Sequence, residues 1–154
     1  MRALDRDYLR EVVSRFEACA HGAARAAGAT VRITPETFVY EPMRANRSLT
    51  ECFRAHLAAV GVEEDPPAPR PALASSDVGN VSQALPTIHP WIGILPPGSP
   101  DIALHTAEFR DAAATEHAHR RMRAAAAALA LTALDVLTDP ACLAAARAEF
   151  ARQR

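Results

Sequence analysis

A run of charged residues and prolines between Glu63 and Pro71 constrains the fold more than any other segment. Four of its nine residues are proline, which lacks a backbone N–H and favours an extended chain. Neither a regular helix nor a central strand can continue through such a segment. We therefore divide the chain into residues 1–62, a linker at 63–71, and residues 72–154.

Apolar spacing and turn residues predict both helices and strands on the two sides of this linker. Before it we expect a helix at 4–27, strands at 30–34 and 37–40, and a helix from Ser48, opened by the capping box Ser48-Leu-Thr-Glu51. After it we expect a turn-rich loop at 75–82, a strand at 87–95, a helix at 112–138, and a last helix opened by Asp139 and Pro140. The mixture predicts an α/β fold.

Composition excludes several classes of protein. With 154 residues, 49% of them hydrophobic, the chain matches one ordinary domain, and a net charge of −1 excludes a bulk electrostatic attraction to nucleic acid or to anionic membranes. No apolar run reaches the roughly 18 residues of a membrane span. The three cysteines are far apart in the sequence and are interpreted as buried thiols in a reducing cytoplasm.

His105 is the first candidate for chemistry. It follows a loop rich in proline and glycine and precedes a helical pattern, a position that could aim an imidazole into a cleft. One histidine cannot hold a catalytic zinc, which takes about three protein ligands. The alternative is a loop histidine that binds no metal.

Candidate substrate contacts lie in a polar loop and at two isolated positions. Asp77, Gly79 and Asn80 could hold a carboxylate or an amide of a substrate, or could form an Asx-type turn that caps a short helix. His89 could face a cleft or lie at the surface, and Asn46 could reach a substrate or begin a helix. Histidines within the predicted helices, such as His21 and His56, are interpreted as helix-surface or interface residues and not as ligands.

Three segments resemble one zinc metallopeptidase family, that of the aminoacylases, carboxypeptidase G and p-aminobenzoyl-glutamate hydrolase. The helix Tyr8–Gly28 with Val31–Ile33 resembles the family's lid, or dimerisation, domain, and Ser75–Pro90 is similar to its substrate-side loop. Leu104–Phe109 looks like the last metal-ligand motif. The resemblance implies that residues 1–62 are part of a two-layer lid and that 72–154 are the C-terminal part of an α/β catalytic domain.

The resemblance also implies a function. Full-length members bind two zinc ions and hydrolyse amide bonds of small N-acyl amino acids or dipeptides, and His105 matches their terminal metal ligand. Their general base and other ligands precede the lid helix, so no catalytic residue is identified here, and we expect neither activity nor tight zinc binding from this chain alone. Expected partners are a small amide substrate in the parent enzyme, and a homodimer or a missing N-terminal half. The alternative is a non-catalytic dimerisation or interaction module derived from the family.

Overall fold

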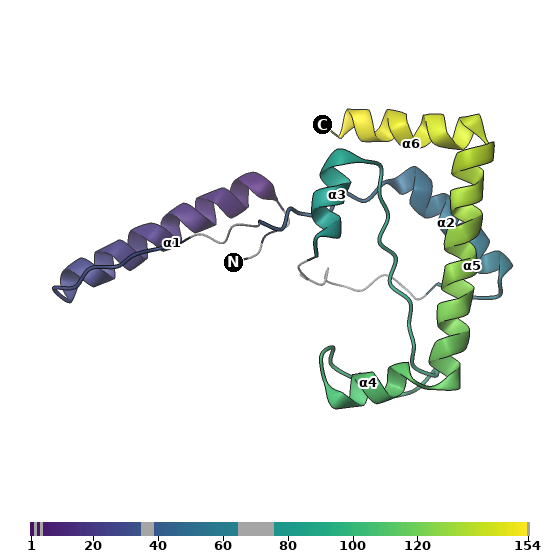
Figure 1. The fold of residues 1–154 in the computed structure, drawn as a ribbon, viewed down its shortest axis with the longest axis horizontal. Helices are drawn as coiled ribbons and strands as arrows, with labels where there is room; N and C mark the ends of the chain where they lie inside the picture. The colour runs from purple at the N-terminus through teal and green to yellow at the C-terminus, as the bar shows by residue number, and fades with distance from the viewer. Residues whose placement is uncertain (2, 4, 35–38, 65–75, 154) are drawn as a thin grey trace. The chain divides into compact units, whose positions relative to one another are not determined.

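The computed structural model describes residues 1, 3, 5–34, 39–64 and 76–153, and this part of the chain forms six helices joined by turns and extended segments (Figure 1). The helices are α1 (Arg6–Ala26), α2 (Arg47–Ala59), α3 (Val78–Ala84), α4 (Ala107–Ala113), α5 (Glu116–Thr138) and α6 (Pro140–Arg152). The predicted first, second and last helices are confirmed, since α1, α2 and α6 lie within a residue or two of the expected bounds.

The α/β prediction is wrong, because the described residues contain no β-strand. Segments 30–34 and 87–95 carry the β-branched residues of strands but lie as irregular chain, and the predicted strand at 37–40 falls partly outside the described residues. Among the described residues, the one β-type backbone pairing is a parallel bridge between Ala45 and Thr87. A strand is stabilised by a ladder of hydrogen bonds to a neighbour. A β-favouring sequence therefore stays irregular where the described chain supplies one bridge instead of a ladder.

The chain divides into two compact units that each combine distant parts of the sequence. Unit 1 consists of Met1–Arg44 and Ala68–Leu85, and unit 2 of Ala45–Pro67 and Pro86–Arg154. Helix α2 precedes the proline-rich segment, yet it lies in the same unit as α5 and α6. The assignment of the two predicted halves to domains of a larger enzyme stays a prediction.

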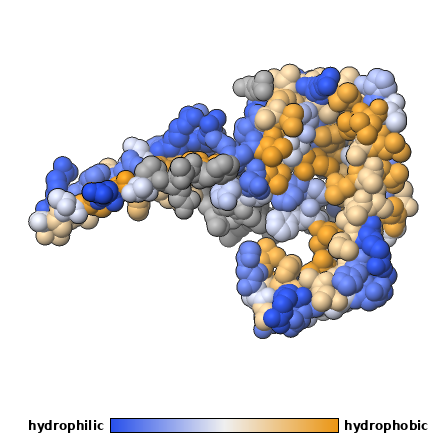
Figure 2. All heavy atoms as spheres, in the orientation of Figure 1, coloured by the Kyte–Doolittle hydropathy of each residue, from blue (hydrophilic) through white to orange (hydrophobic). Residues whose placement is uncertain are grey.

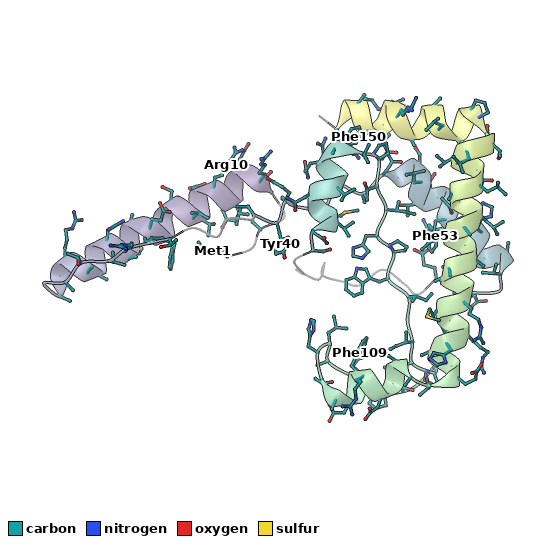
Figure 3. All side chains as sticks on the ribbon, in the orientation of Figure 1. Met1, Arg10, Tyr40, Phe53, Phe109 and Phe150 are labelled. Carbon is teal, nitrogen blue, oxygen red and sulfur yellow. The ribbon has the colours of Figure 1, made fainter. Side chains whose placement is uncertain are left out.

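Unit 2 has its core on one face of α2. Leu49, Phe53 and Leu57 recur at helical spacing and are buried, and Phe53 lies between α2 and α5 (Figure 3). Burying each such side chain stabilises the fold by about 1.5–3 kcal/mol. The core is completed by Val62 and Ala128, with Val60, Ile88, Ile92 and Ala124 packed against it.

Helix α5 contacts α2 through small residues and leaves larger ones exposed. Its buried residues are Ala118, Ala128 and Thr132. The exposed large apolar residues of α5 are Met122, Leu129, Leu131, Leu134 and Leu137, and Figure 2 shows apolar side chains at the surface over this helix. No single helix of the described residues is long and apolar enough to cross a membrane; α5 and α6 pass that test only as a pair bent by 96°.

The expected helix at 112–138 is divided into α4 and α5. Thr115 begins α5, because its side chain accepts a hydrogen bond from the N–H of Ala118 (3.2 Å). The same hydroxyl donates to the carbonyl of Ala112 (2.8 Å), which ties the new helix to the end of α4. An N-cap threonine inside a helical pattern was the signal for this break.

The N-terminus of α2 is capped by Asn46 and not by the predicted box at Ser48. The side-chain oxygen of Asn46 accepts from the N–H of Leu49 (3.1 Å), and its own N–H donates to the carbonyl of Thr87 (2.9 Å). Its amide nitrogen donates to the carbonyl of Ala146 in α6 (2.9 Å). Asn46 is only 1% exposed, so all three bonds are protected from water.

Glu149 of α6 binds the two remaining N–H groups at this helix end. Its carboxylate accepts from the N–H of Arg47 (2.7 Å) and from the N–H of Ser48 (2.8 Å). The hydroxyl of Ser48 donates to the same carboxylate (2.7 Å). A carboxylate is also favoured here by the positive end of the helix dipole. The four N–H groups that a helix leaves unpaired at its start are therefore all satisfied.

Replacing Asn46 separates its two side-chain functions. Asn46→Ala removes the cap and leaves buried polar groups unpaired, so we expect the free energy of unfolding, measured in urea, to fall by about 2–4 kcal/mol. Asn46→Ser keeps a neutral capping oxygen but loses the donor to Ala146, so its loss should be clearly smaller. Equal losses in the two variants would contradict a capping role.

The Glu149 carboxylate should make stability depend on pH. Burial raises the pKa of Glu149, but hydrogen bonds from Ser48 and Arg47 outweigh it, and the net pKa lies below its ordinary value of 4.5. Its stabilisation is then complete above about pH 4.5 and is lost as the pH falls through the lower, folded-state pKa. Glu149→Gln should lower the free energy of unfolding by about 1–2 kcal/mol at pH 7, and this difference should shrink below pH 4.5.

Urea unfolding of both proteins between pH 7 and pH 3 measures the effect. The matched control is Glu17→Gln on the exposed surface of α1, which should show no such difference. A Glu149→Gln effect that is constant across this range would contradict the prediction.

Candidate functional site

The polar loop predicted at 75–82 becomes α3, and its side chains bind the backbone of residues 39–44 in unit 1. The side-chain oxygen of Asn80 accepts from the N–H of Glu41 (3.1 Å), and its amide nitrogen donates to the carbonyl of Val39 (2.9 Å). One amide thus pairs with a donor and an acceptor of an extended segment, as a neighbouring strand would.

Ser82 and Gln83 continue this pairing. The fully buried hydroxyl of Ser82 accepts from the N–H of Arg44 (2.9 Å) and donates to the carbonyl of Gly79 (2.5 Å). The amide nitrogen of Gln83 donates to the carbonyl of Pro42 (2.6 Å). Three side chains of the seven-residue α3 therefore bind backbone groups of residues 39–44, which a neighbouring strand would bind in a sheet.

Gly79 is closely packed against the backbone, whereas the side chain of Asp77 is open to solvent. A Cβ atom on Gly79 would lie 1.9 Å from the carbonyl oxygen of Glu41, so this position has no room for a side chain. Asp77 occupies the N-cap position of α3 but makes no side-chain cap bond, and the hydroxyl of Ser76 accepts from the N–H of Val78 instead (3.2 Å). Asp77 is exposed, so its carboxylate is the one that this loop presents to solvent.

His105 is exposed and has a left-handed backbone, with φ of 65°. This conformation is uncommon outside glycine, although histidine adopts it more often than most residues. The next residue, Thr106, is the N-cap of α4, and its side chain accepts from the N–H of Phe109 (3.2 Å). Among the described residues, no group of three potential metal ligands includes His105.

The other predicted site residues are spread over both units. His89 is exposed, and its ring lies beside that of Trp91, with centroids 5.8 Å apart. Asn46 caps α2, so the helix-terminus interpretation of this residue is confirmed. His89, His105 and Asn46 belong to unit 2, whereas Asp77, Gly79 and Asn80 belong to unit 1. Their roles toward a substrate or a metal stay predictions.

An unforeseen cluster joins Cys52 and His56 of α2 to Asp135 of α5. The carboxylate oxygen Oδ2 of Asp135 lies 3.1 Å from Sγ of Cys52 and 2.6 Å from Nε2 of His56. Hydrogen bonds from Cys52 and then from His56 lower the pKa of Asp135. Burial, followed by the bond to Asp135, raises the pKa of the Cys52 thiol to about 12. The available sequence signal was a cysteine and a histidine four positions apart, which share a helix face.

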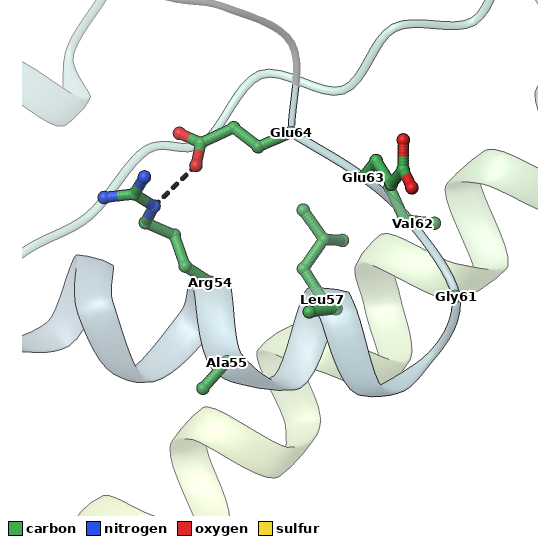
Figure 4. Close-up of a pocket in the computed structure, with 8 residues that line it drawn as sticks. Arg54, Ala55, Leu57, Gly61, Val62, Glu63 and Glu64 are labelled. Carbon is green, nitrogen blue, oxygen red and sulfur yellow. Dashed lines mark hydrogen bonds and ion pairs between the residues drawn. The ribbon is translucent and has the colours of Figure 1, made fainter.

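An open groove of about 640 Å³ lies where α2 ends (Figure 4). Leu57 and Val62 form its apolar wall, and Arg54 forms an ion pair with Glu64 across it (2.5 Å). The ion pair occupies the charges of Arg54 and Glu64, and the rest of the lining is small or apolar apart from the carboxylate of Glu63.

The sequence is similar to two dipeptidases along nearly its whole length. It is 35% identical over 152 residues to the Xaa-Arg dipeptidase of Mus musculus, and 34% identical over 152 residues to that of Homo sapiens. Each alignment covers 97% of this chain but 34% of the relative, so the chain spans about a third of the length of these curated relatives. No family model matches. These homologues support the resemblance to peptidases and amidohydrolases.

The close approach at Gly79 should make it intolerant of any side chain. Gly79→Ala forces the Glu41 carbonyl away from α3, at a cost of about 2 kcal/mol or more. We expect hydrogen exchange of the Glu41 and Arg44 amides to accelerate on the order of 30-fold.

Gly22→Ala is the matched control for this substitution. Gly22 lies within α1, and a Cβ atom there meets nothing within 4 Å. The control should leave exchange at Glu41 and Arg44 unchanged and stabilise α1 by up to about 1 kcal/mol. Unchanged exchange in Gly79→Ala would show that the contact does not hold the segment.

Proposed function

We propose that this chain is the C-terminal portion of a metal-dependent peptidase that cleaves dipeptides ending in arginine. The observation that carries the proposal is the 35% identity to the Xaa-Arg dipeptidase of Mus musculus over 97% of the chain. The order of the three resembling segments supports it as well. The parent reaction is hydrolysis of the amide bond of a small dipeptide or N-acyl amino acid.

His105 is the residue of this chain that we propose as a metal ligand. Its left-handed backbone costs roughly 1–3 kcal/mol, a cost that proteins accept most often at functional sites. Its exposure leaves the imidazole available to a metal ion held mainly by residues outside those described.

The described residues do not fit the family's zinc ions by themselves. A catalytic zinc needs about three protein ligands, and His105 belongs to no group of three potential ligands among the described residues. We therefore expect the 154-residue chain to be inactive alone.

Asp77 is the residue that we propose for recognition of the substrate's arginine. Its carboxylate is exposed and makes no cap bond. A carboxylate can pair with a guanidinium through two parallel hydrogen bonds, which gives both strength and direction. The side-chain amide of Asn80, in contrast, is already hydrogen-bonded to the backbone of Val39 and Glu41.

A chimaera tests the proposal. This chain replaces the matching third of the mouse Xaa-Arg dipeptidase, and hydrolysis of an Xaa-Arg dipeptide is measured with added Zn²⁺. We expect the chimaera to be active and the isolated chain to be inactive. His105→Ala should lower kcat/KM by more than about 100-fold, because loss of a metal ligand exceeds loss of a residue that only supports a ligand.

His119→Ala, an exposed histidine on α5, is the matched control and should retain activity. Asp77→Asn should raise KM for an Xaa-Arg dipeptide more than for an uncharged one. Hydrolysis by the 154-residue chain alone, unaffected by His105→Ala, would refute the proposal.

A second candidate function is a non-catalytic dimerisation module, and the exposed apolar side chains of α5 favour it. Leu134 is 52% exposed and Leu137 is 82% exposed, and with the other exposed apolar residues of α5 they form the kind of apolar surface that marks an interaction site. Pairing of two copies through this face predicts a discrete dimer in sedimentation equilibrium, reduced to monomer by Leu134→Glu. A monomer at all concentrations would exclude this alternative.

A further inference from the structure

We propose that Cys52, His56 and Asp135 form a binding site for a thiophilic divalent cation such as Zn²⁺, with Cys142 of α6 as the fourth ligand. This site shares no residue with the proposed peptidase site and does not depend on that function. Its role would be structural, because a bound ion would connect α2, α5 and α6.

The ligand atoms already converge. Cys52 and His56 are four residues apart on α2 and point to the same side, and Asp135 approaches from α5. One ligand atom from each of the three residues lies within 4.8 Å of the others. Thiolate, imidazole and carboxylate are the three kinds of ligand that zinc accepts in proteins.

Small shifts would convert this cluster into a metal site. Ligands at 2.0–2.3 Å from a tetrahedral zinc lie roughly 3.3–3.8 Å from each other. Nε2 of His56 and Oδ2 of Asp135, now 2.6 Å apart, would separate by somewhat less than about 1 Å, which a χ rotation of Asp135 provides. The ion would replace the hydrogens that now link the three side chains.

Cys142 lies outside the group of three whose ligand atoms already converge, but it is a neighbour of Cys52, and an entry path is present. The thiol of Cys142, near the start of α6, is close enough to that of Cys52 to contribute to its raised pKa. The side chain of His56 is 23% exposed and that of Asp135 is 38% exposed, so an ion can enter from solvent. Two thiolates and one carboxylate would supply three negative charges against the two positive charges of the ion.

A nucleophilic role for the same residues is disfavoured. A catalytic cysteine needs a lowered pKa, usually with a histidine as its base. Here burial and the neighbouring carboxylate raise the pKa of Cys52 to about 12, and His56 bonds to Asp135. A divalent cation reverses this situation, because it binds the thiolate directly and displaces the proton.

Cobalt titration of the reduced chain tests the proposal. Co²⁺ bound by thiolate gives an intense near-ultraviolet charge-transfer band, and competition with Zn²⁺ then gives the zinc affinity. We expect this band in the unaltered protein and a zinc dissociation constant below about 1 µM at pH 7. Cys52→Ser and His56→Ala should weaken zinc binding at least 100-fold, and Cys142→Ser should weaken it at least tenfold while leaving a reduced band.

Cys19→Ser on α1 is the matched control and should bind both metals as the unaltered chain does. Zn²⁺ should also raise the Tm of the unaltered protein and of Cys19→Ser, but not that of Cys52→Ser. Absence of the band in the unaltered reduced chain, or its persistence at full intensity in Cys52→Ser, would overturn the site. An unchanged affinity in Cys142→Ser would overturn the assignment of the fourth ligand.

Discussion

The N-terminus of α2 is closed by residues from the far end of unit 2, and the packing of that unit depends on this contact. Asn46 binds the carbonyl of Ala146, and Glu149 binds the N–H groups of Arg47 and Ser48. These bonds fix the orientation of α2 relative to α6. That orientation determines which face of α2 packs against α5. The apolar core around Phe53 and the cluster around Asp135 both follow from that orientation.

Helices could be predicted from the sequence because their signals are local. Gly28 has the positive φ expected where α1 ends, and Asp139 with Pro140 begins α6 as predicted. The absence of strands from the described residues could not be predicted, because whether a β-favouring segment pairs depends on a partner that no local pattern supplies. In unit 1 the partner of residues 39–44 is a helix, whose polar side chains looked like a substrate loop. The cap of α2 was misplaced for a similar reason, since Glu149 lies 101 positions beyond Ser48.

The candidate sites show the same difference between local sequence signals and contacts of distant residues. His105 and the loop with Asp77 were candidates from their local sequence, and resemblance to a family gave them expected roles, a resemblance that the identity to Xaa-Arg dipeptidases supports. The cysteine–histidine–aspartate cluster was missed because Asp135 is 79 positions from His56. Its local half, two residues four apart on one helix, is too common to predict a site by itself. Only the packing of α5 on α2 brings the third side chain to the other two.

The distance along the chain between α2 and its cap also has a consequence for synthesis. Chains grow at roughly 5–20 residues per second, so about 5–20 s pass between the appearance of Arg47 and that of Glu149. Throughout that interval α2 lacks its carboxylate cap, and for most of it α2 also lacks α5, whose Ala128 packs with Phe53 and Leu57. Short helices of this length are marginal in water by themselves. The first helix of unit 2 to leave the ribosome is therefore among the last to become stable.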